Sequence, residues 1–429
     1  MTKLPRQILV APPVARHALD NPSIELRQRL TGEWTGEDWA GKRVAVAVGS
    51  RGIDRIAEMA NTVVQWLRAQ GATPFIMPAM GSHGGATPEG QCGVLATYGV
   101  TEAAMLAPIE ASMDVVELGE TAAGVPVVVS SMALGADAVI LINRVKPHTD
   151  FGSPVLGSGL LKMSAIGLGK AEGAFRCHRA ASVHGHEAVI RAVSSVALSR
   201  LPRPYGIALV EDGAHQLARI ALMRGPEIAT KERELYAIAR GWMPALPLEQ
   251  LDVLVVDQIG KNISGAGMDT KVVNRGVNGE YNPWNVAPKF QRIFVRDLSE
   301  LTYNSAVGLG MADVVTDRLV NRINWEPTLI NSLTANTPAA IRTPIHFKTD
   351  RECLERIAPT VGRMSLDDVT YGWIRNTMEL SRLALSENLR PQIEKNPLLE
   401  IEATVDLEFD GDYNLISPFA PVEETAGAH

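Results

Sequence analysis

The stretch that decides the fold is residues 42–85, KRVAVAVGSRGIDRIAEMANTVVQWLRAQGATPFIMPAMGSHGG. It opens with the apolar run Val44–Val48, which is typical of a strand buried on both faces. Apolar residues then recur at helical spacing until Gly71: Ile56, Met59, Val63, Val64 and Leu67. A second apolar strand follows and ends in a glycine-rich loop. This order of strand, helix and strand predicts a right-handed parallel α/β unit.

Further apolar runs continue the pattern along the chain. They are Ala136–Asn143, Tyr205–Asp212 and, after the proline-bearing segment WMPALPLEQ, LDVLVVDQIG at residues 251–260. We therefore expect an α/β protein with two α/β domains, mostly parallel sheets and an active-site cleft between them. The expected N-terminal domain is 1–247 and the C-terminal domain is 248–396. The alternating segment 397–429 is expected to pack back onto one of them as a strand.

The bulk composition narrows the class of protein. The chain has 429 residues, of which 46% are hydrophobic and 21% charged, and a net charge of −7. These values are ordinary for a globular protein and argue against a nucleic-acid-binding surface. No apolar run is long enough to cross a membrane, and the first residues have no small-residue cleavage site, so we do not expect a secretory signal. Three widely spaced cysteines suit a reducing compartment. We expect a cytoplasmic protein that binds neither membranes nor nucleic acid.

Polar residues follow three of the predicted strands at the point where each strand ends. Arg51, His83 and His148 each lie just past the carboxyl end of an expected parallel strand. In open α/β sheets this edge is where ligands bind. We therefore expect the three side chains to converge on one crevice, although they are far apart in sequence.

Lys162 is the second unusual feature, because it lies in the small and apolar stretch SPVLGSGLLKMSAIGLGK, residues 153–170. One interpretation is that the side chain only extends out of an apolar segment to reach water. The other is that a partly desolvated amine reacts covalently at this position. The glycine spacing of a phosphate-binding loop is absent, and so is a dinucleotide-binding fingerprint at the first strand–helix turn.

A third cluster is CHRAASVHGH, which contains Cys177, His178, His184 and His186. Its spacing fits no common structural zinc pattern. A single histidine of this stretch acting as a metal ligand is the favoured interpretation. His184 and His186 then decorate a helix surface.

Taken as an ordered set, these features resemble the nickel-dependent lactate racemase family. The set consists of the loop at Arg51, GSHGGATPEG at His83, NRVKPHTDF at His148, then Lys162 and His178. The resemblance is clearest from Val44 to His186. It implies two α/β domains and a nickel-pincer nucleotide, pyridinium-3,5-bisthiocarboxylic acid mononucleotide nickel. It also implies cofactor-synthesis proteins as partners.

The resemblance also implies roles for individual residues. His83 and His148 correspond to the acid–base pair of the family. Lys162 corresponds to the lysine that tethers the cofactor through a thioamide, and His178 to the protein ligand of nickel. Arg51 corresponds to the arginine that holds the substrate carboxylate.

Some stretches depart from the pattern of the racemases. The loop VGSRGI replaces their Asp-x-Thr-Arg-Pro, and Gly84 follows His83 where they carry arginine. In GKNISGAGMDTKVVNRG, residues 260–276, Asn274 is placed where a glutamine meets the cofactor. Lys261, Asn262 and Lys271 of the same stretch are expected to bind the substrate. These differences favour a small-molecule 2-hydroxy acid other than lactate, racemised or epimerised by reversible hydride transfer.

Two alternatives stay open at this point. One is a metal-dependent hydrolase or lyase that uses His178 with His184 or His186. The other is a binding protein that keeps the family fold without catalysis.

Overall fold

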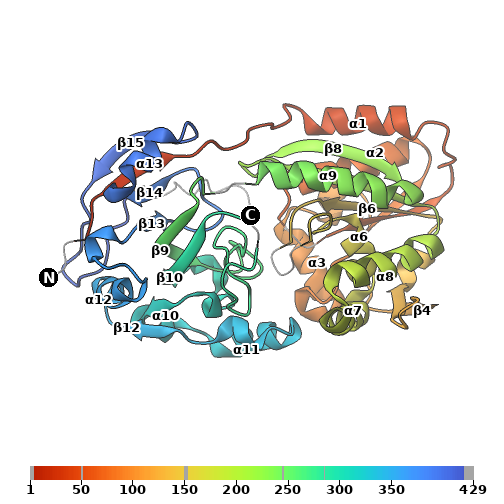
Figure 1. Cartoon of the computed structure of the whole chain (residues 1–429). Helices are drawn as coiled ribbons and strands as arrows, with labels where there is room; N and C mark the ends of the chain where they lie inside the picture. The colour runs from red at the N-terminus through yellow and green to blue at the C-terminus, as the bar shows by residue number, and fades with distance from the viewer. Residues whose placement is uncertain (1–3, 50–51, 149–152, 244–245, 285, 420–429) are drawn as a thin grey trace. The chain divides into compact units, whose positions relative to one another are not determined.

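The computed structural model describes residues 4–49, 52–148, 153–243, 246–284 and 286–419 (Figure 1). The chain divides into two compact units. The first is Ala15–Met243, and the second combines Met1–Val14 with Pro244–Glu424. Each unit has its own sheet in which parallel pairing predominates. The expected α/β class with mostly parallel sheets is therefore confirmed.

The sheet of the first unit has the strand order β3-β2-β6-β7-β8. Its strands are β3 (Thr73–Pro78), β2 (Arg43–Val48), β6 (Ala138–Arg144), β7 (Pro204–Glu211) and β8 (Leu217–Arg224). The first four are mutually parallel, and β8 pairs antiparallel with β7. A separate antiparallel hairpin joins β4 (Val115–Glu120) to β5 (Pro126–Ser130).

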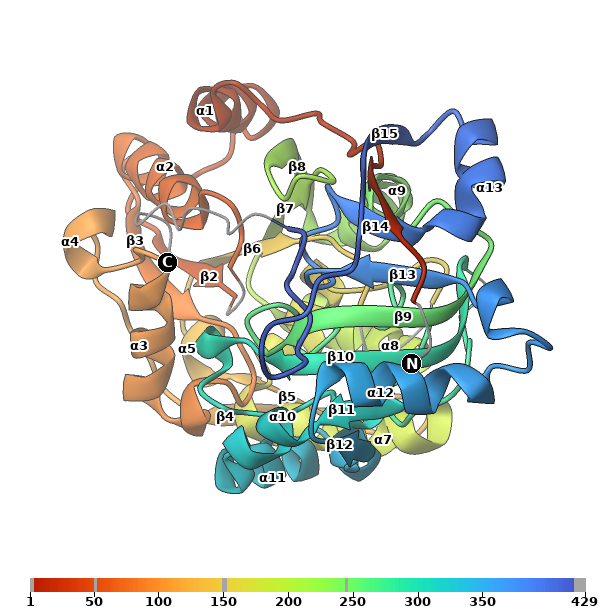
Figure 2. The same ribbon diagram turned by 90° about the vertical axis from the view of Figure 1, so that its left-hand side faces the viewer.

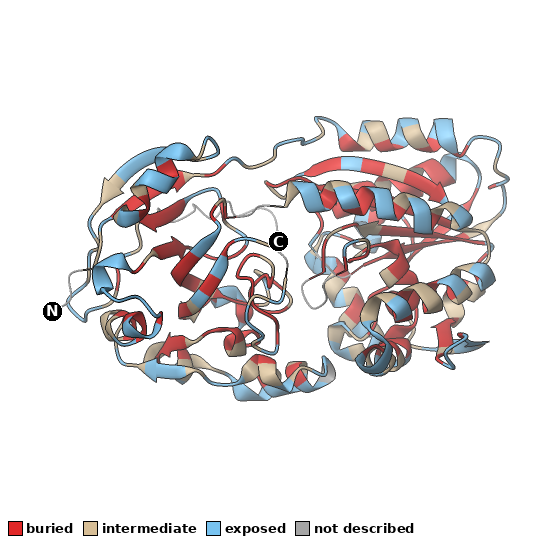
Figure 3. Ribbon diagram, viewed as in Figure 1, coloured by how far each residue is buried: buried red, intermediate tan, exposed pale blue. Residues whose placement is uncertain are grey.

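Helices cover both faces of this sheet. Successive residues of a buried strand point to opposite faces, so each strand contributes side chains to two cores. Val44 and Val46 lie in the core under α1 and α2, whereas Ala45 and Ala47 lie in the core under α7, α8 and α9. The burial pattern along these strands is visible in Figure 3. The helices are α1 (Pro22–Glu33), α2 (Ile56–Ala69), α3 (Pro88–Thr97), α4 (Glu102–Met105), α5 (Ser131–Leu134), α6 (Leu160–Lys162), a π-helix (Met163–Gly167), α7 (Lys170–His184), α8 (His186–Arg200) and α9 (Ile228–Trp242).

The sheet of the second unit has the order β12-β11-β10-β9-β13-β14-β1-β15, and Figure 2 shows its strands. The parallel part consists of β12 (Ile345–Phe347), β11 (Val314–Thr316), β10 (Lys289–Leu298), β9 (Gln250–Ile259) and β13 (Tyr371–Ile374). The antiparallel part adds β14 (Leu383–Ser386), β1 (Gln7–Ala11) and β15 (Glu400–Val405). The helices are α10 (Asp317–Arg322), α11 (Trp325–Thr334), α12 (Asp350–Ile357) and α13 (Arg390–Lys395). Among the described helices of both units, none combines the length and apolar character needed to span a membrane.

Strand β1 belongs to the second unit, whereas the sequence grouped residues 1–247 as one domain. Its backbone pairs with β14 on one side and with β15 on the other. Ile8 and Val10 are fully buried in the same core as β9. The C-terminal segment also returns to the sheet as a strand. This strand, β15, pairs antiparallel with β1. The local hydrophobic pattern around β1 could not identify β14 and β15 as its partners, because they lie hundreds of residues away in the sequence.

A substitution in β1 tests this assignment. Ile8→Ala removes a fully buried side chain and should cost about 2–5 kcal/mol of the free energy of unfolding, because the cavity cannot close. The control is Ile24→Ala on α1, where the side chain is 55% exposed and the cost should be small. Urea unfolding measures both, and hydrogen exchange should show the loss in β14 and β15. Equal destabilisation by the two substitutions would contradict the buried position of β1 between β14 and β15.

Candidate functional site

The loops after β2, β3 and β6 emerge from one edge of the first sheet. The three strands are parallel, and Val48 pairs with both Pro78 and Ile142 at their carboxyl ends. His83 and His148 therefore follow strand ends at the same edge, which is where ligands bind in open α/β sheets. The predicted Arg51 lies outside the described residues.

His148 and Lys162 meet directly at this edge. The Nζ atom of Lys162 is hydrogen-bonded to Nε2 of His148. His148 is only 8% exposed, whereas Lys162 is the one residue of 159–170 that is not buried. The amine of Lys162 thus contacts an imidazole. The interpretation that this side chain only extends out of an apolar segment to reach water does not describe that contact.

Hydrogen bonds join the residues that precede His148 to the residues that precede Lys162. Lys146 and Ser158 exchange two backbone hydrogen bonds of 3.0 and 2.8 Å. Asn143, near the end of β6, donates from Nδ2 to the carbonyl of Gly159 at 3.0 Å. These bonds return the chain to the strand end from which His148 departed.

A carboxylate from α9 binds the turn that carries Lys162. The Oε2 atom of Glu232 accepts the backbone N–H groups of Leu160 and Leu161, the latter at 3.1 Å. Burial raises the pKa of the Glu232 carboxyl to about 7, against the lowering effect of these two hydrogen bonds.

The His83 loop is a tight glycine turn. Gly84 has φ +66°, and a Cβ at this position would lie 2.5 Å from the carbonyl carbon of Gly90. Only glycine fits there without strain. His83 itself is exposed, and its backbone carbonyl accepts from Nε2 of Gln91 at 3.4 Å. The turn thus leaves the His83 side chain exposed, while the backbone carbonyl of His83 is hydrogen-bonded to Gln91.

A buried lysine supports this loop from below. Lys170 is fully buried, and its Nζ donates to the carbonyl of Pro78 at 2.7 Å and to Oε1 of Gln91 at 3.1 Å. Gln91 in turn donates from Nε2 to the carbonyl of Gly81 at 2.9 Å. Desolvation lowers the pKa of Lys170 to about 8, with the nearby Cys92 acting weakly in the other direction.

The His83 loop and the Lys162 segment also contact one another. The backbone N–H of Gly81 donates to the carbonyl of Gly167 at 3.1 Å, at the end of the π-helix that begins directly after Lys162. A Cβ on Gly167 would lie 2.6 Å from the carbonyl oxygen of Ala79. The structure therefore brings the segments of His83, His148 and Lys162 together.

An ion pair supports the described residues Gly52 and Asp54. Arg144 pairs with Glu211 and also donates to the carbonyl of Gly52 at 3.2 Å. Glu211 accepts the backbone N–H of Asp54 at 2.8 Å. The residues that follow Arg51 are thus attached to the strand end that leads to His148.

His178 lies half-buried on α7, with its ring centroid 6.1 Å from that of His186. Cys177 is buried beside it, its Sγ 3.7 Å from the carbonyl of Ala165, and burial raises its pKa to about 12. Across the part of the chain that the structure describes, no three His, Cys, Asp or Glu side chains are close enough to hold a metal. The four-residue zinc cluster considered from the sequence is therefore not assembled.

Three of the residues predicted to bind the substrate, Lys261, Asn262 and Lys271, belong to the second unit. Lys261 donates from Nζ to Oδ1 of Asn331 at 2.9 Å. Lys271 lies with its Nζ 4.7 Å from the ring centroid of Trp284, and Asn262 is exposed. Their predicted role stays a prediction.

Asn274 is used inside the second unit. It is fully buried with φ +43°, and its Nδ2 donates to the carbonyl of Val286 at 2.9 Å. Its Oδ1 accepts the backbone N–H of Trp284 at 3.3 Å. The predicted contact with a cofactor stays a prediction, and it would require these bonds to be exchanged.

Glu232, Lys170 and Gln91 were not identified from the sequence. Glu232 left one local signal, because it shares the buried face of α9 with Ile228 and Leu235. A carboxylate on the apolar side of a helix needs a polar partner in the core. Nothing local indicates that this partner is a turn 72 residues earlier.

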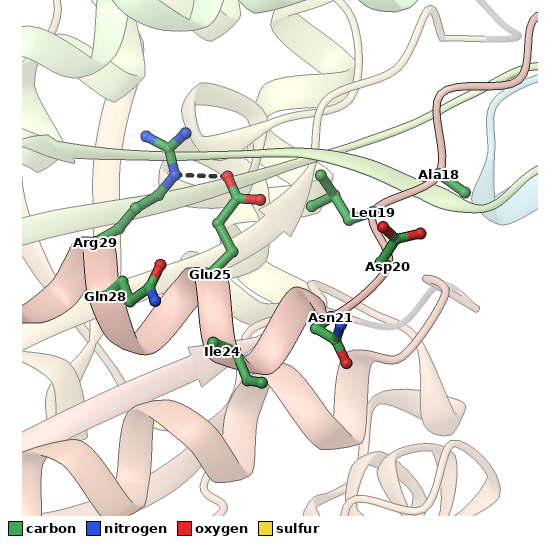
Figure 4. A pocket seen from close by; sticks show the side chains of 8 residues that line it. All are labelled: Ala18, Leu19, Asp20, Asn21, Ile24, Glu25, Gln28 and Arg29. Carbon is green, nitrogen blue, oxygen red and sulfur yellow. Dashed lines mark hydrogen bonds and ion pairs between the residues drawn. The ribbon is translucent and has the colours of Figure 1, made fainter.

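A depression lies beside the start of α1 (Figure 4). It is lined by Ala18, Leu19, Asp20, Asn21, Ile24, Glu25, Gln28 and Arg29. Glu25 and Arg29 pair with one another at 2.9 Å. The lining includes neither a histidine nor a lysine, so it offers none of the chemistry found at the strand ends.

Comparison with known proteins finds similarity in sequence to one family model and in fold to solved structures. Residues 39–189 match the family model of the lactate racemase N-terminal domain. No curated protein matches the chain by sequence. A solved structural genomics target from Thermotoga maritima has a TM-score of 0.53 and 14% identity, covering 83% of this chain and 94% of that chain. The lactate racemase apoprotein from Thermoanaerobacterium thermosaccharolyticum has a TM-score of 0.48 and 11% identity, covering 82% and 90%.

Residues 39–189, which lie in the first unit, are thus similar to the lactate racemase N-terminal domain. His83, His148, Lys162 and His178 all fall within the matched residues.

The buried lysine gives a testable dependence of stability on pH. Between pH 8 and 10.5 Lys170 is neutral in the folded protein but protonated in the unfolded chain, so stability should rise with pH across this window. Lys170→Met should remove this rise, which is on the order of 3 kcal/mol. Urea unfolding at steps of pH measures it, with Lys231→Met, a partly exposed lysine, as control. Parallel profiles for wild type and Lys170→Met would contradict the assignment.

Proposed function

We propose that the chain is an isomerase that racemises or epimerises a 2-hydroxy acid other than lactate, using a nickel-pincer nucleotide attached to Lys162. The observation that supports it is the contact between Lys162 and His148 at the carboxyl edge of the first sheet, inside the region that matches the family model. A reactive amine and a proton-carrying imidazole are the two groups that this chemistry requires from the protein at one place.

The residues present fit the proposed cofactor. Thioamide attachment needs an accessible amine, and Lys162 is the one side chain of residues 159–170 that is not buried. His178, half-buried, would be the nickel ligand, since a neutral imidazole suits this metal. The described residues provide no three-ligand metal cluster of their own, which is compatible with a metal whose other ligands come from the cofactor. When bound, the cofactor would accept hydride from the α-carbon of the substrate and return it.

The two histidines would carry the hydroxyl proton. A hydroxy acid that loses hydride from its α-carbon must also lose the proton of its hydroxyl group, and the planar 2-keto acid must regain both. Reaction of either enantiomer requires a base for each face of that carbon, so His83 and His148 would take one face each. Both residues follow strand ends at the same edge.

The contact between Lys162 and His148 has a consequence for the acid–base role. While Lys162 is a free amine, it and the imidazole are partners in one hydrogen bond. A thioamide at Lys162 would have one N–H donor and no basic lone pair. Attachment of the cofactor at Lys162 would thus end the competition for a proton, leaving His148 as the base.

The carboxylate of the substrate would be held by Arg51, as the resemblance implies. A guanidinium binds a carboxylate through two parallel hydrogen bonds, and it therefore sets the orientation of the α-carbon. The ion pair of Arg144 with Glu211 supports this proposal, because it attaches Gly52 and Asp54 to the end of β6. Lys261, Asn262 and Lys271 of the second unit would bind further polar groups of the substrate.

Substitution of the histidines tests the acid–base assignment. His83→Ala and His148→Ala should each lower racemisation at least ~100-fold, the usual scale for loss of a general acid or base. Cofactor-loaded protein is screened on 2-hydroxy acids by loss of optical rotation. In heavy water the product should carry no deuterium at the α-carbon, because hydride returns to it.

The control for this experiment is His184→Ala, since His184 is exposed at the end of α7. It should keep full activity. Unchanged rates in both strand-end variants, or a selective loss in His184→Ala, would instead favour the metal-dependent hydrolase or lyase.

Covalent attachment at Lys162 is tested separately from activity. The protein is produced together with the cofactor-synthesis proteins, and its intact mass is measured. Wild type should show the added mass of the cofactor, and Lys162→Ala should lack it because no amine remains at this position. Lys231→Ala should retain it. An equal mass shift in wild type and Lys162→Ala would place the attachment elsewhere.

A further inference from the structure

Glu232 is a buried carboxylate that the proposed chemistry does not use. It is 2% exposed in the second turn of α9 and approaches the start of α6. Its Oε2 atom accepts the N–H groups of Leu160 and Leu161. The first N–H groups of a helix have no partner within the helix, so a carboxylate at this place stabilises the turn.

We propose that Glu232 is a positioning residue whose single oxygen Oε2 clamps the turn carrying Lys162, so that the amine of Lys162 meets His148. The inference rests on the proposed function for the role of Lys162. It adds a residue of α9, outside the region that matches the family model, to the support of the site.

The clamp is complementary to a glycine. A Cβ on Gly159 would lie 2.5 Å from the carboxyl carbon of Glu232 and 2.6 Å from each of its oxygens, closer than real side chains approach. On the other side, Asn143 donates to the carbonyl of Gly159. The peptide units around Gly159 are thus bonded on two sides, three residues before Lys162. The direction in which Lys162 leaves the turn follows from these bonds.

Only one oxygen of Glu232 takes part. Oε1 is buried and has no hydrogen-bond partner within the described residues. Because burial raises the pKa of the carboxyl to about 7, with Arg191 of α8 opposing weakly, the group is partly protonated near neutrality. A proton on Oε1 leaves Oε2 free to accept both N–H groups. The clamp therefore needs an acceptor rather than a charge, and an amide side chain should replace it.

The clamp can be separated from the packing of the turn. Leu160 and Leu161 are buried at 0% and 3% exposure, and their side chains keep the turn in the core whatever occupies position 232. A helix as short as α6 does not maintain its own geometry. The contribution of Glu232 is therefore local order at the two amide groups and the placement of Lys162.

The experiment uses the full chain without cofactor. Hydrogen exchange at the amides of Leu160 and Leu161 is followed by mass spectrometry with fragmentation, and the labelling rate of Lys162 by a small amine-reactive reagent is measured in parallel. Glu232→Ala should speed exchange at both amides about tenfold or more, the scale of one lost buried hydrogen bond. It should also raise labelling of Lys162 severalfold. Glu232→Gln should stay close to wild type in both.

Two further variants keep the test decisive. Glu234→Ala removes an exposed carboxylate from the same helix and should change neither readout. Gly159→Ala places a methyl group against the carboxyl of Glu232, so it should speed exchange at the same two amides. It replaces Glu232→Ala in the test if Glu232→Ala fails to fold. Wild-type exchange in Glu232→Ala or Gly159→Ala, or equal loss in Glu232→Gln and Glu232→Ala, would overturn the clamp. Because no cofactor is present, these outcomes are independent of whether Lys162 is the attachment site.

Discussion

The structure of the first unit depends on one constraint: the loops at the carboxyl edge of the sheet must keep their turns while their buried backbone groups are hydrogen-bonded. The unit meets this requirement with a polar side chain behind each loop. Glu232 binds the turn of Lys162, Gln91 and Lys170 bind the turn of His83, and Arg144 with Glu211 binds the loop after β2. These groups hold the loops from the inside, while His83 is exposed and Lys162 is half-buried.

Burial of two ionisable side chains, Lys170 and Glu232, costs free energy of folding, and this cost disfavours other geometries of the loops that they bind. A lysine and a glutamate are each placed in the core without a partner of opposite charge at hydrogen-bonding distance among the described contacts. Their pKa values shift toward the neutral form for the same reason, downward for Lys170 and upward for Glu232. Both groups bond to backbone atoms of the loops. Each loop geometry is thus selected by a buried group that has no comparably good alternative partner.

The elements of the fold that the sequence predicts are those whose apolar residues recur at short, regular spacing. The strand at Val44–Val48 and the helix that follows it could be predicted because their patterns repeat within a few residues. The position of β1 could not, because its partners β14 and β15 lie near the other end of the chain. The site divides in the same way. His83 and His148 could be located because polar residues at strand ends are a local feature, whereas Glu232 lies 72 residues from the amide it binds.

Two lysines of the same stretch show what the sequence alone could not distinguish. Lys162 follows GSGLL and Lys170 follows AIGLG, and both look like a cation amid glycine and aliphatic residues. In the folded chain Lys170 is fully buried, with its amine bonded to a backbone carbonyl and a glutamine. Lys162 is the residue of its segment that escapes burial, and its amine contacts an imidazole. The amine of Lys170 is enclosed by carbonyl and amide oxygens and supports a loop, whereas the amine of Lys162 reaches a strand-end histidine. The difference between the two roles arises from tertiary contacts, since the local sequence around both is nearly the same.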